Sequence, residues 1–435
     1  MLGRLRCLPG RLEALRPFED MLSQPQPETA IRQAKAAGRK VIGTFCGLVP
    51  NEIIHAAGAA AVRLCGGSPA AAQRVPADLP RDLCPVLKSA AGTLLSGEQE
   101  VLHSLDLVVV PATCDWKAKF GPRLREHVPT VVLDVTHAKD HEAARGAWRR
   151  EVERFYHEVQ GITGAPLGRR ELLASIRVYR QATALSRRLV ESMKADEPPL
   201  WGSDLLLVHN ALFYLPIEQW IASAAPLVGA ASRGDPRRAD GTLPLLPSPS
   251  GRGAGGEGCN ALPPRLLLAG SPTVWPDYKL PLLIESSGGR IVADESCAGS
   301  RQLLDAVKVD EPTVPDALWA LADRYYLPCT CPCFTPNPDR QRRLAAMVAD
   351  YRVDGVVYHV LKSCFLYDAE LAATRAALTP SPSPRGRGED GVPILRLETD
   401  LVGGSEEQLR NRVEAFLELL RERKECNRRP SVNSG

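Results

Sequence analysis

The sequence lacks a long apolar run, a strong charge imbalance and a leader-like N-terminus. No apolar run in its 435 residues reaches the ~18 residues that a membrane-spanning helix needs. With 54 Lys and Arg against 51 Asp and Glu, the net charge is only +3, which gives no general field for nucleic acid or anionic membrane. Pro9 and Pro17 interrupt the N-terminus before any continuous apolar core, unlike a secretory signal. We therefore expect a cytoplasmic protein with no nucleic-acid and no membrane partner.

Three common functional motifs are also missing from the sequence. There is no CxxC…CxxC zinc pattern, no G-x-x-x-x-G-K-[ST] phosphate-binding loop and no G-x-S-x-G nucleophile elbow.

The composition is otherwise ordinary for a globular protein, with 44% hydrophobic and 24% charged residues. The length favours two or three domains. Two counts stand out, namely 37 Pro with 35 Gly, and 12 Cys. In a reducing cytoplasm the cysteines are expected as free thiols, which serve as core residues, as metal ligands or as redox groups.

Apolar, β-branched runs alternate with helix-periodic segments along most of the chain. This alternation predicts an α/β fold with two Rossmann-like parallel-sheet domains and a helical subdomain. Strands are expected at 40–45, 105–113, 130–135, 265–272, 290–296, 354–364 and 392–400. The predicted organisation is a helical lead-in (1–35), a first α/β domain (36–140), a helical subdomain (141–230), a low-complexity insert (231–262), a second α/β domain (263–425, with an insert at 378–391) and a tail (426–435). Ser405 is expected to cap the last helix.

The two inserts share the pattern PSPS-x-RG-x-G, at 247–255 and at 380–388. Pro, Ser, Gly and Arg bury too little apolar area to offset the entropy of ordering. We favour one repetitive element inserted twice into tolerant surface loops, and a basic linker or peptide-binding motif is the alternative.

Several cysteines follow predicted strands or open predicted helices. Cys46, Cys114 and Cys297 come directly after strands, Cys364 ends another strand run, and Cys84 lies at a loop-to-helix junction. Sites in open α/β sheets gather at the carboxyl ends of strands, and helix N-termini stabilise thiolates. Single cysteines far apart in the sequence suit an iron–sulfur cluster, although buried cysteine is often simply part of the core.

Longer segments around these cysteines resemble a known family. TFCGLVPNEIIHAAGAAAVRLCG, DLCPVLKSAAG, VVVPATCDWKAK and DGVVYHVLKSCFLYDAE occur in the order found in the 2-hydroxyacyl-CoA dehydratase and benzoyl-CoA reductase family. The resemblance implies that Cys84, Cys114 and Cys364 hold a [4Fe–4S] cluster. It also implies an ATP-dependent activator protein with its own iron–sulfur cluster, a homodimer or a paralogous partner subunit, and a small-molecule substrate such as a CoA thioester.

A subgroup of the family carries extra cysteines and is thought to hold a double-cubane [8Fe–9S] cluster through six of them. The additional ligands would be Cys46, Cys297 and Cys333, or Cys331 in place of Cys333. Those relatives resemble reductases of small molecules. A third reading is a non-catalytic electron-transfer partner or a decayed paralogue, since two inserts interrupt the chain. Cys329 lies outside the subgroup's pattern, and we expect Cys7, Cys259 and Cys426 to be incidental.

Four other side chains lie close to these motifs. Glu52 in the first turn of a predicted helix either stabilises the helix dipole or transfers a proton. His359 is expected to be a core residue, and Asp115 to cap the next helix. Arg301 is expected in a surface ion pair, with binding of an anionic substrate as the alternative.

Overall fold

The structure is built around two four-stranded parallel sheets. The computed structural model describes residues 1–97, 99–233, 262–379, 391–404 and 406–428. The first sheet has the order β2 (Ala60–Arg63), β1 (Val41–Thr44), β3 (Leu107–Pro111), β4 (Thr130–Leu133). The second has the order β6 (Arg290–Asp294), β5 (Arg265–Gly270), β7 (Gly355–Leu361), β8 (Ile394–Thr399). The repeated order confirms the predicted α/β fold with two Rossmann-like domains.

Burial on both faces explains the sequences of the central strands. Every residue of β3 and of β7 is buried, and strands covered on both sides read as continuous apolar runs. Gly270 ends β5 with φ +103°, and an added Cβ there would lie 2.0 Å from the carbonyl oxygen of His359. Only glycine allows this backbone turn so close to β7.

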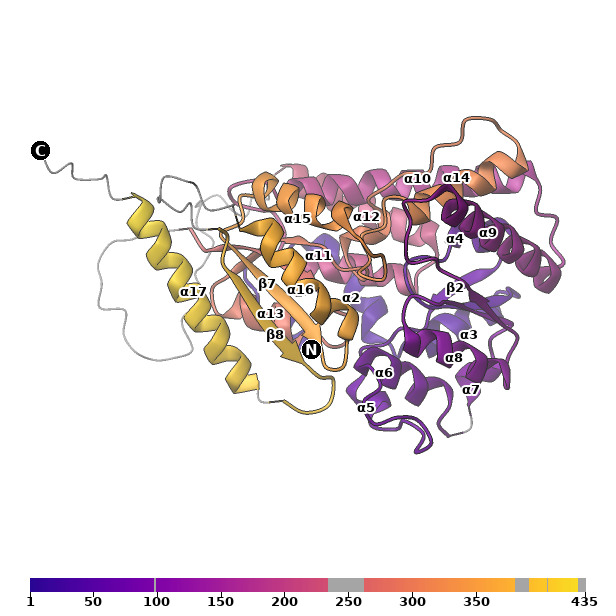
Figure 1. The fold of residues 1–435 in the computed structure, drawn as a ribbon, viewed down its shortest axis with the longest axis horizontal. Coiled ribbons are helices and arrows are strands. Elements are labelled where there is room, and N and C mark those ends of the chain that lie inside the picture. Colours follow the sequence, from indigo (N-terminus) through magenta and orange to yellow (C-terminus); the bar gives the residue numbers. More distant parts are fainter. Residues whose placement is uncertain (98, 234–261, 380–390, 405, 429–435) are drawn as a thin grey trace, which may run out of the picture.

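Helices cover the sheets and open the chain (Figure 1). The N-terminal segment and the first domain contain α1 (Leu2–Arg6), α2 (Arg16–Ser23), α3 (Glu28–Ala36), α4 (Asn51–Ala56), α5 (Pro69–Ala72), α6 (Pro85–Leu94), α7 (Glu100–His103) and α8 (Asp115–Arg125). The second domain contains α13 (Lys279–Ser286), α14 (Val314–Tyr326), α15 (Pro338–Asp350), α16 (Phe365–Leu378) and α17 (Glu406–Arg428).

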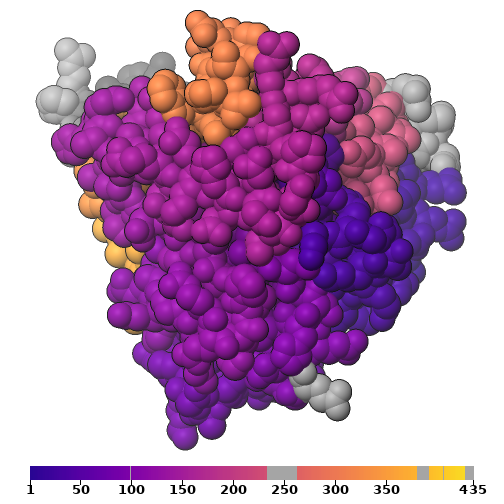
Figure 2. Space-filling model, turned by 90° about the vertical axis from the view of Figure 1, so that its right-hand side faces the viewer, coloured from indigo at the N-terminus to yellow at the C-terminus, as the bar shows by residue number. Residues whose placement is uncertain are grey.

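Four helices connect the two sheet domains, namely α9 (Glu142–Thr163), α10 (Arg169–Ser192), α11 (Gly202–Asn210) and α12 (Ile217–Arg233). Helix α14 returns from the second half of the chain and packs on α9, where Tyr326 stacks on Trp148. Figure 2 shows this segment in orange at the top of the face that the first half of the chain forms. The chain therefore passes from the first half to the second sheet domain after α12, and α14 packs back against the first half.

The strand order places a crevice at the carboxyl ends of each sheet. The order reverses between β1 and β3 in the first sheet and between β5 and β7 in the second. Ligands of open α/β sheets bind at such switch points. Cys46 follows β1 and Cys114 follows β3, whereas Cys364 follows β7 and Cys297 follows β6.

The seven strands expected from the sequence are all present, with ends at most three residues from the predicted ones. The sequence analysis did not predict β2, and Ser405 lies outside the described residues, as do 234–261 and 380–390. In the part of the chain that is described, no helix is long and apolar enough to cross a membrane. The domain boundaries themselves stay a prediction.

Candidate functional site

A cavity of about 620 Å³ lies where the carboxyl ends of the two sheets meet, and we call it the cysteine cavity. Its lining brings together all six cysteines that the sequence analysis proposed as ligands, although they span 46–364 in the sequence. The cysteines that line it are Cys46, Cys65, Cys84, Cys114, Cys297, Cys331, Cys333 and Cys364.

Three of these cysteines share one local structure. Cys84, Cys114 and Cys364 each immediately precede a helix, namely α6, α8 and α16. The N-terminus of a helix carries a partial positive charge, which favours the thiolate over the thiol. Backbone N–H groups of the first turn act in the same direction: they help to lower the pKa of Cys364 and oppose the upward shifts of Cys84 and Cys114.

Cys84 and Cys364 interact directly. A hydrogen bond with Cys84 is the main cause that lowers the pKa of Cys364 to about 7. The same hydrogen bond, with burial, raises the pKa of Cys84 well above its usual value. The first sulfur of this pair to lose its proton near neutral pH is therefore Cys364. Burial raises the pKa of Cys114, although the ammonium of Lys117 opposes the shift.

The other ligand candidates form a second group around Cys331. A hydrogen bond from Cys333 lowers the pKa of Cys331 to about 5, and the same contact raises that of Cys333. Burial raises the pKa of Cys297 to about 12, and the negative charges of Cys46 and Cys331 act in the same direction. Cys46 has φ +64°, a left-handed conformation that is uncommon outside glycine and is concentrated at functional sites.

Lys117 lies between the two groups. Burial alone would lower its pKa, but the attraction of Cys46, Cys114, Cys65 and Cys297 raises it well above its usual value. Its ammonium donates a hydrogen bond to Thr113 Oγ1 at 2.9 Å. Lys117 therefore places one fixed positive charge among the sulfurs.

Within the described ranges, no three His, Cys, Asp or Glu side chains come close enough to hold a single metal ion. An iron–sulfur cluster binds through cysteine thiolates, each on its own iron, so its ligands stand apart around it. The hydrogen-bonded pair Cys84 and Cys364 would have to separate to hold one. Cysteines spread over the lining of one large cavity fit such a cluster better than a lone ion.

The family model for the 2-hydroxyglutaryl-CoA dehydratase D-component matches residues 46–420, which include every ligand candidate. The chain belongs to this family. It is 30% identical over 398 residues to the Escherichia coli (strain K12) protein named as dehydratase subunit YjiM, covering 90% of this chain and 94% of that protein.

Two further relatives have more specific names. The (R)-phenyllactyl-CoA dehydratase beta subunit of Clostridium sporogenes is 19% identical over 93% of this chain and 97% of its own length. The (R)-2-hydroxyglutaryl-CoA dehydratase beta subunit of Acidaminococcus fermentans is 26% identical over 40% of this chain and 45% of its own length. Together with the family they support a component of the 2-hydroxyacyl-CoA dehydratase type.

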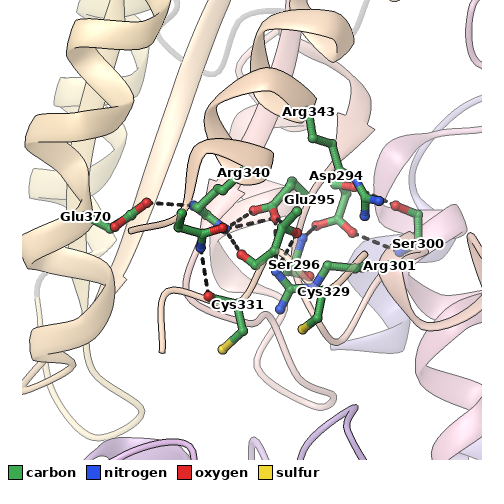
Figure 3. Close-up of polar contacts among 12 residues, drawn as sticks. Asp294, Glu295, Ser296, Ser300, Arg301, Cys329, Cys331, Arg340, Arg343 and Glu370 are labelled. Carbon is green, nitrogen blue, oxygen red and sulfur yellow. Dashed lines mark hydrogen bonds and ion pairs between the residues drawn. The ribbon is translucent and has the colours of Figure 1, made fainter. Parts of the chain in front are cut away.

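A buried polar network fixes the backbone beside Cys329 and Cys331 in this D-component family member (Figure 3). Glu295 accepts hydrogen bonds from Thr330 Oγ1 at 2.8 Å and from Arg340 Nη1 at 2.9 Å. Arg340 also donates to the carbonyl oxygen of Thr330 at 3.1 Å. Thr330 lies between the two cysteines, so the network holds their backbone while both sulfurs point away from Arg340 (Figure 3).

The same network corrects the expectation for Arg301. Its guanidinium pairs with Glu295 at 2.9 Å, and the Arg301 side chain is only 8% exposed. The predicted surface ion pair is therefore wrong, because the partner lies on the buried loop after β6 rather than at the surface. On that loop, Asp294 accepts the backbone N–H groups of Ser296 at 3.2 Å and Ser300 at 3.1 Å, which fixes the turn that carries Cys297.

Of the remaining candidates, Glu52 and His359 lie outside the lining of the cysteine cavity, whereas Asp115 is part of it. Glu52 is buried in α4 and accepts a hydrogen bond from Tyr325 at 2.8 Å. His359 is a core residue as predicted, with ring contacts to Ser271 and Thr399. Cys114, not Asp115, is the N-cap of α8, so the predicted cap is wrong by one residue.

Sequence reasoning missed Glu295, Thr330, Arg340 and Arg63. The first three acquire their roles only through contacts between separate segments, and no local pattern marks them. Arg63 did carry a signal, because a lone arginine follows three small apolar residues within AAVRLC.

Proposed function

We propose that this protein is the iron–sulfur catalytic component of a 2-hydroxyacyl-CoA dehydratase or benzoyl-CoA reductase type enzyme. Cys84, Cys114 and Cys364 would hold its [4Fe–4S] cluster. The observation that carries the proposal is that these three cysteines each immediately precede a helix and line one cavity at the meeting of two sheets.

The surroundings of the three sulfurs suit this role. Ligand cysteines must be thiolates. Backbone N–H groups at the three helix N-termini favour the charged form of each sulfur, and Lys117 does so for Cys114 and Cys364. When bound, such a cluster supplies one-electron reduction and an iron with an open position. Val86, Leu87, Phe213 and Val274 give part of the lining an apolar surface, which excludes water and strengthens the interaction of these charges.

The partners follow from the same proposal. A separate ATP-hydrolysing activator with its own iron–sulfur cluster would deliver the electron, because this sequence has no phosphate-binding loop. Two of the relatives are named as beta subunits, which supports assembly with a paralogous subunit or with a second copy. The substrate would be a small molecule such as a CoA thioester.

A second candidate is a double-cubane [8Fe–9S] reductase of small molecules. The observation in its favour is that Cys46, Cys297 and Cys333 line the same cavity as the first three cysteines. Cys331 also lines it, and its low pKa of about 5 makes it at least as good a thiolate ligand as Cys333.

Single alanine variants test the ligand set. We expect Cys84→Ala, Cys114→Ala and Cys364→Ala, purified without oxygen, each to lose the visible absorption of the cluster. Cys426→Ala serves as the control, because Cys426 is exposed on α17, outside the lining of the cysteine cavity. Retention of full iron content in all three variants would overturn the assignment. Cys46→Ala and Cys297→Ala distinguish the two candidates, since only the six-cysteine cluster needs them.

A further inference from the structure

Arg63 is a buried cation that has no ionic partner among the residues that the structure describes. It is the last residue of β2 and is 7% exposed. No carboxylate of the described residues lies within ion-pair distance of it, and its Nε has no hydrogen-bond partner. Its one specific contact places the guanidinium 4.8 Å from the centre of the Phe213 ring. An unpaired buried charge is costly, so a site that retains one usually pairs it with something else.

The space around Arg63 can admit a ligand. Arg63 lines the cysteine cavity and also a neighbouring cavity of about 210 Å³, which we call the side cavity. The register explains this position, since Arg63 pairs with Thr44 at the carboxyl end of β1, two residues before Cys46. Its guanidinium therefore lies beside the sheet edge where the sulfurs gather.

The other charged groups of the side cavity already have partners. Arg39 donates to the carbonyl oxygens of Gly58 at 3.0 Å and Ala59 at 2.6 Å. His55 pairs with Glu218 at 2.6 Å. Among these charged side chains, Arg63 is therefore the one whose guanidinium is left to bind a ligand.

A second polar side chain of the side cavity, Asn51, also has an atom without a hydrogen-bond partner. Asn51 lines the side cavity, and its buried Oδ1 accepts no hydrogen bond in the described structure. A ligand that satisfied both side chains would carry an anionic oxygen group for Arg63 and a hydrogen-bond donor, such as a hydroxyl, for Asn51. The planar fork of arginine suits carboxylate and phosphate equally.

We propose that Arg63 binds the anionic group, carboxylate or phosphate, of a small ligand that occupies the side cavity and extends toward the cysteine cavity. Identifying this ligand as the substrate rests on the function proposed above, whereas the anion site itself does not require the cluster. The site would hold one end of the molecule while the other end lies near the sulfurs.

Isothermal titration calorimetry of the full-length, anaerobically purified protein tests the site. Malate is the probe for a hydroxylated carboxylate, and pyrophosphate is the probe for a phosphate group. We expect at least one of them to bind, and Arg63→Gln to weaken that binding by about tenfold or more, as for loss of a charged hydrogen bond. The probe that binds more tightly shows whether the anionic group of the ligand is a carboxylate or a phosphate.

Arg39→Gln is the matched control, because it removes the same charge from the same cavity but from a side chain that is already bonded to two backbone carbonyls. We expect it to change the affinity less than about twofold. Equal loss in both variants, or no binding of either probe to the original protein, would overturn the proposal.

Two further measurements separate this inference from a structural role and from the proposed function. Arg63→Leu should not lower the melting temperature, since it removes an unpaired buried charge. A large drop would make Arg63 a structural residue and contradict the proposal. Iron content, measured on the same samples, should be unchanged in Arg63→Gln. If the protein bound the anion but contained no iron, the anion site would be supported and the proposed iron–sulfur function would be rejected.

Discussion

Arg340 and Glu295 form an ion pair with 2.7 Å between Nη1 and Oε2, although their side chains are 0% and 1% exposed. Glu295 also pairs with Arg301, so this one carboxylate contacts two buried guanidinium groups. Glu370, 4.0 Å from Arg340 Nε, is a further and longer contact. Breaking a buried pair by removing one partner leaves an uncompensated charge and costs about 3–5 kcal/mol.

Glu295→Gln should therefore destabilise the protein more than Arg340→Gln does. The first leaves Arg301 without a carboxylate and Arg340 with only Glu370, at 4.0 Å, whereas the second keeps the Arg301 pair. Denaturant unfolding without oxygen measures the difference. Arg342→Gln is the control, because its pair with Asp339 is exposed and should change stability by less than about 0.5 kcal/mol. Equal effects of all three would contradict this picture of the network.

Lys117 should influence how readily the proposed cluster accepts an electron. Removing a positive charge beside the sulfurs makes reduction harder, so Lys117→Met should shift the reduction potential to more negative values, on the order of tens of millivolts. Lys119→Met is the control, because Lys119 lines the same cavity but is exposed and screened by water. A redox titration that finds equal shifts in both variants would contradict the placement of Lys117.

His359 should make stability fall as the pH falls. Burial lowers its pKa to about 4, from 6.5 in the unfolded chain. The unfolded state therefore binds more protons between these values, and the stability contributed by neutral His359 is complete above pH 6.5 and is lost toward pH 4. Between pH 7 and pH 5 we expect the wild type to lose about 2 kcal/mol relative to His359→Gln. Unfolding curves of both proteins at the two pH values check this, and parallel behaviour would contradict it.

Gly270 should not tolerate a side chain. Its φ of +103° and the 2.0 Å approach of an added Cβ to the His359 carbonyl oxygen require a backbone shift between β5 and β7. Gly270→Ala should cost about 3 kcal/mol or more. Gly161→Ala, in α9 with open space at its Cβ, should instead stabilise by about 0.5–1 kcal/mol. A melting temperature that fell equally in both variants would show that crowding at Gly270 is not the cause.

The sequence predicted the parts of this fold that local pattern controls. Buried parallel strands such as β3 and β7 read as apolar runs, so both were found. The strand β2 was missed because Ala60–Arg63 is short, alanine-rich and ends in a charge, which outweighs the single valine as a strand signal.

The candidate site was predicted to the extent that it follows from topology. Cysteines at strand ends must gather at the carboxyl edge of a parallel sheet, so Cys46 and Cys114 were expected together. The meeting of the two sheets, which adds Cys297 and Cys364, came from the family resemblance alone. The pairing of Glu295 with Arg340 depends on tertiary packing across 45 residues, for which a single sequence carries no local signal.

The most direct test of the account is the iron and acid-labile sulfide content of the protein purified without oxygen. A [4Fe–4S] cluster on Cys84, Cys114 and Cys364 predicts about four irons and four sulfides per chain, with broad visible absorption. A value near eight irons would replace it with the six-cysteine cluster. A colourless protein without iron, despite intact folding, would contradict the central claim that this cavity is an iron–sulfur site.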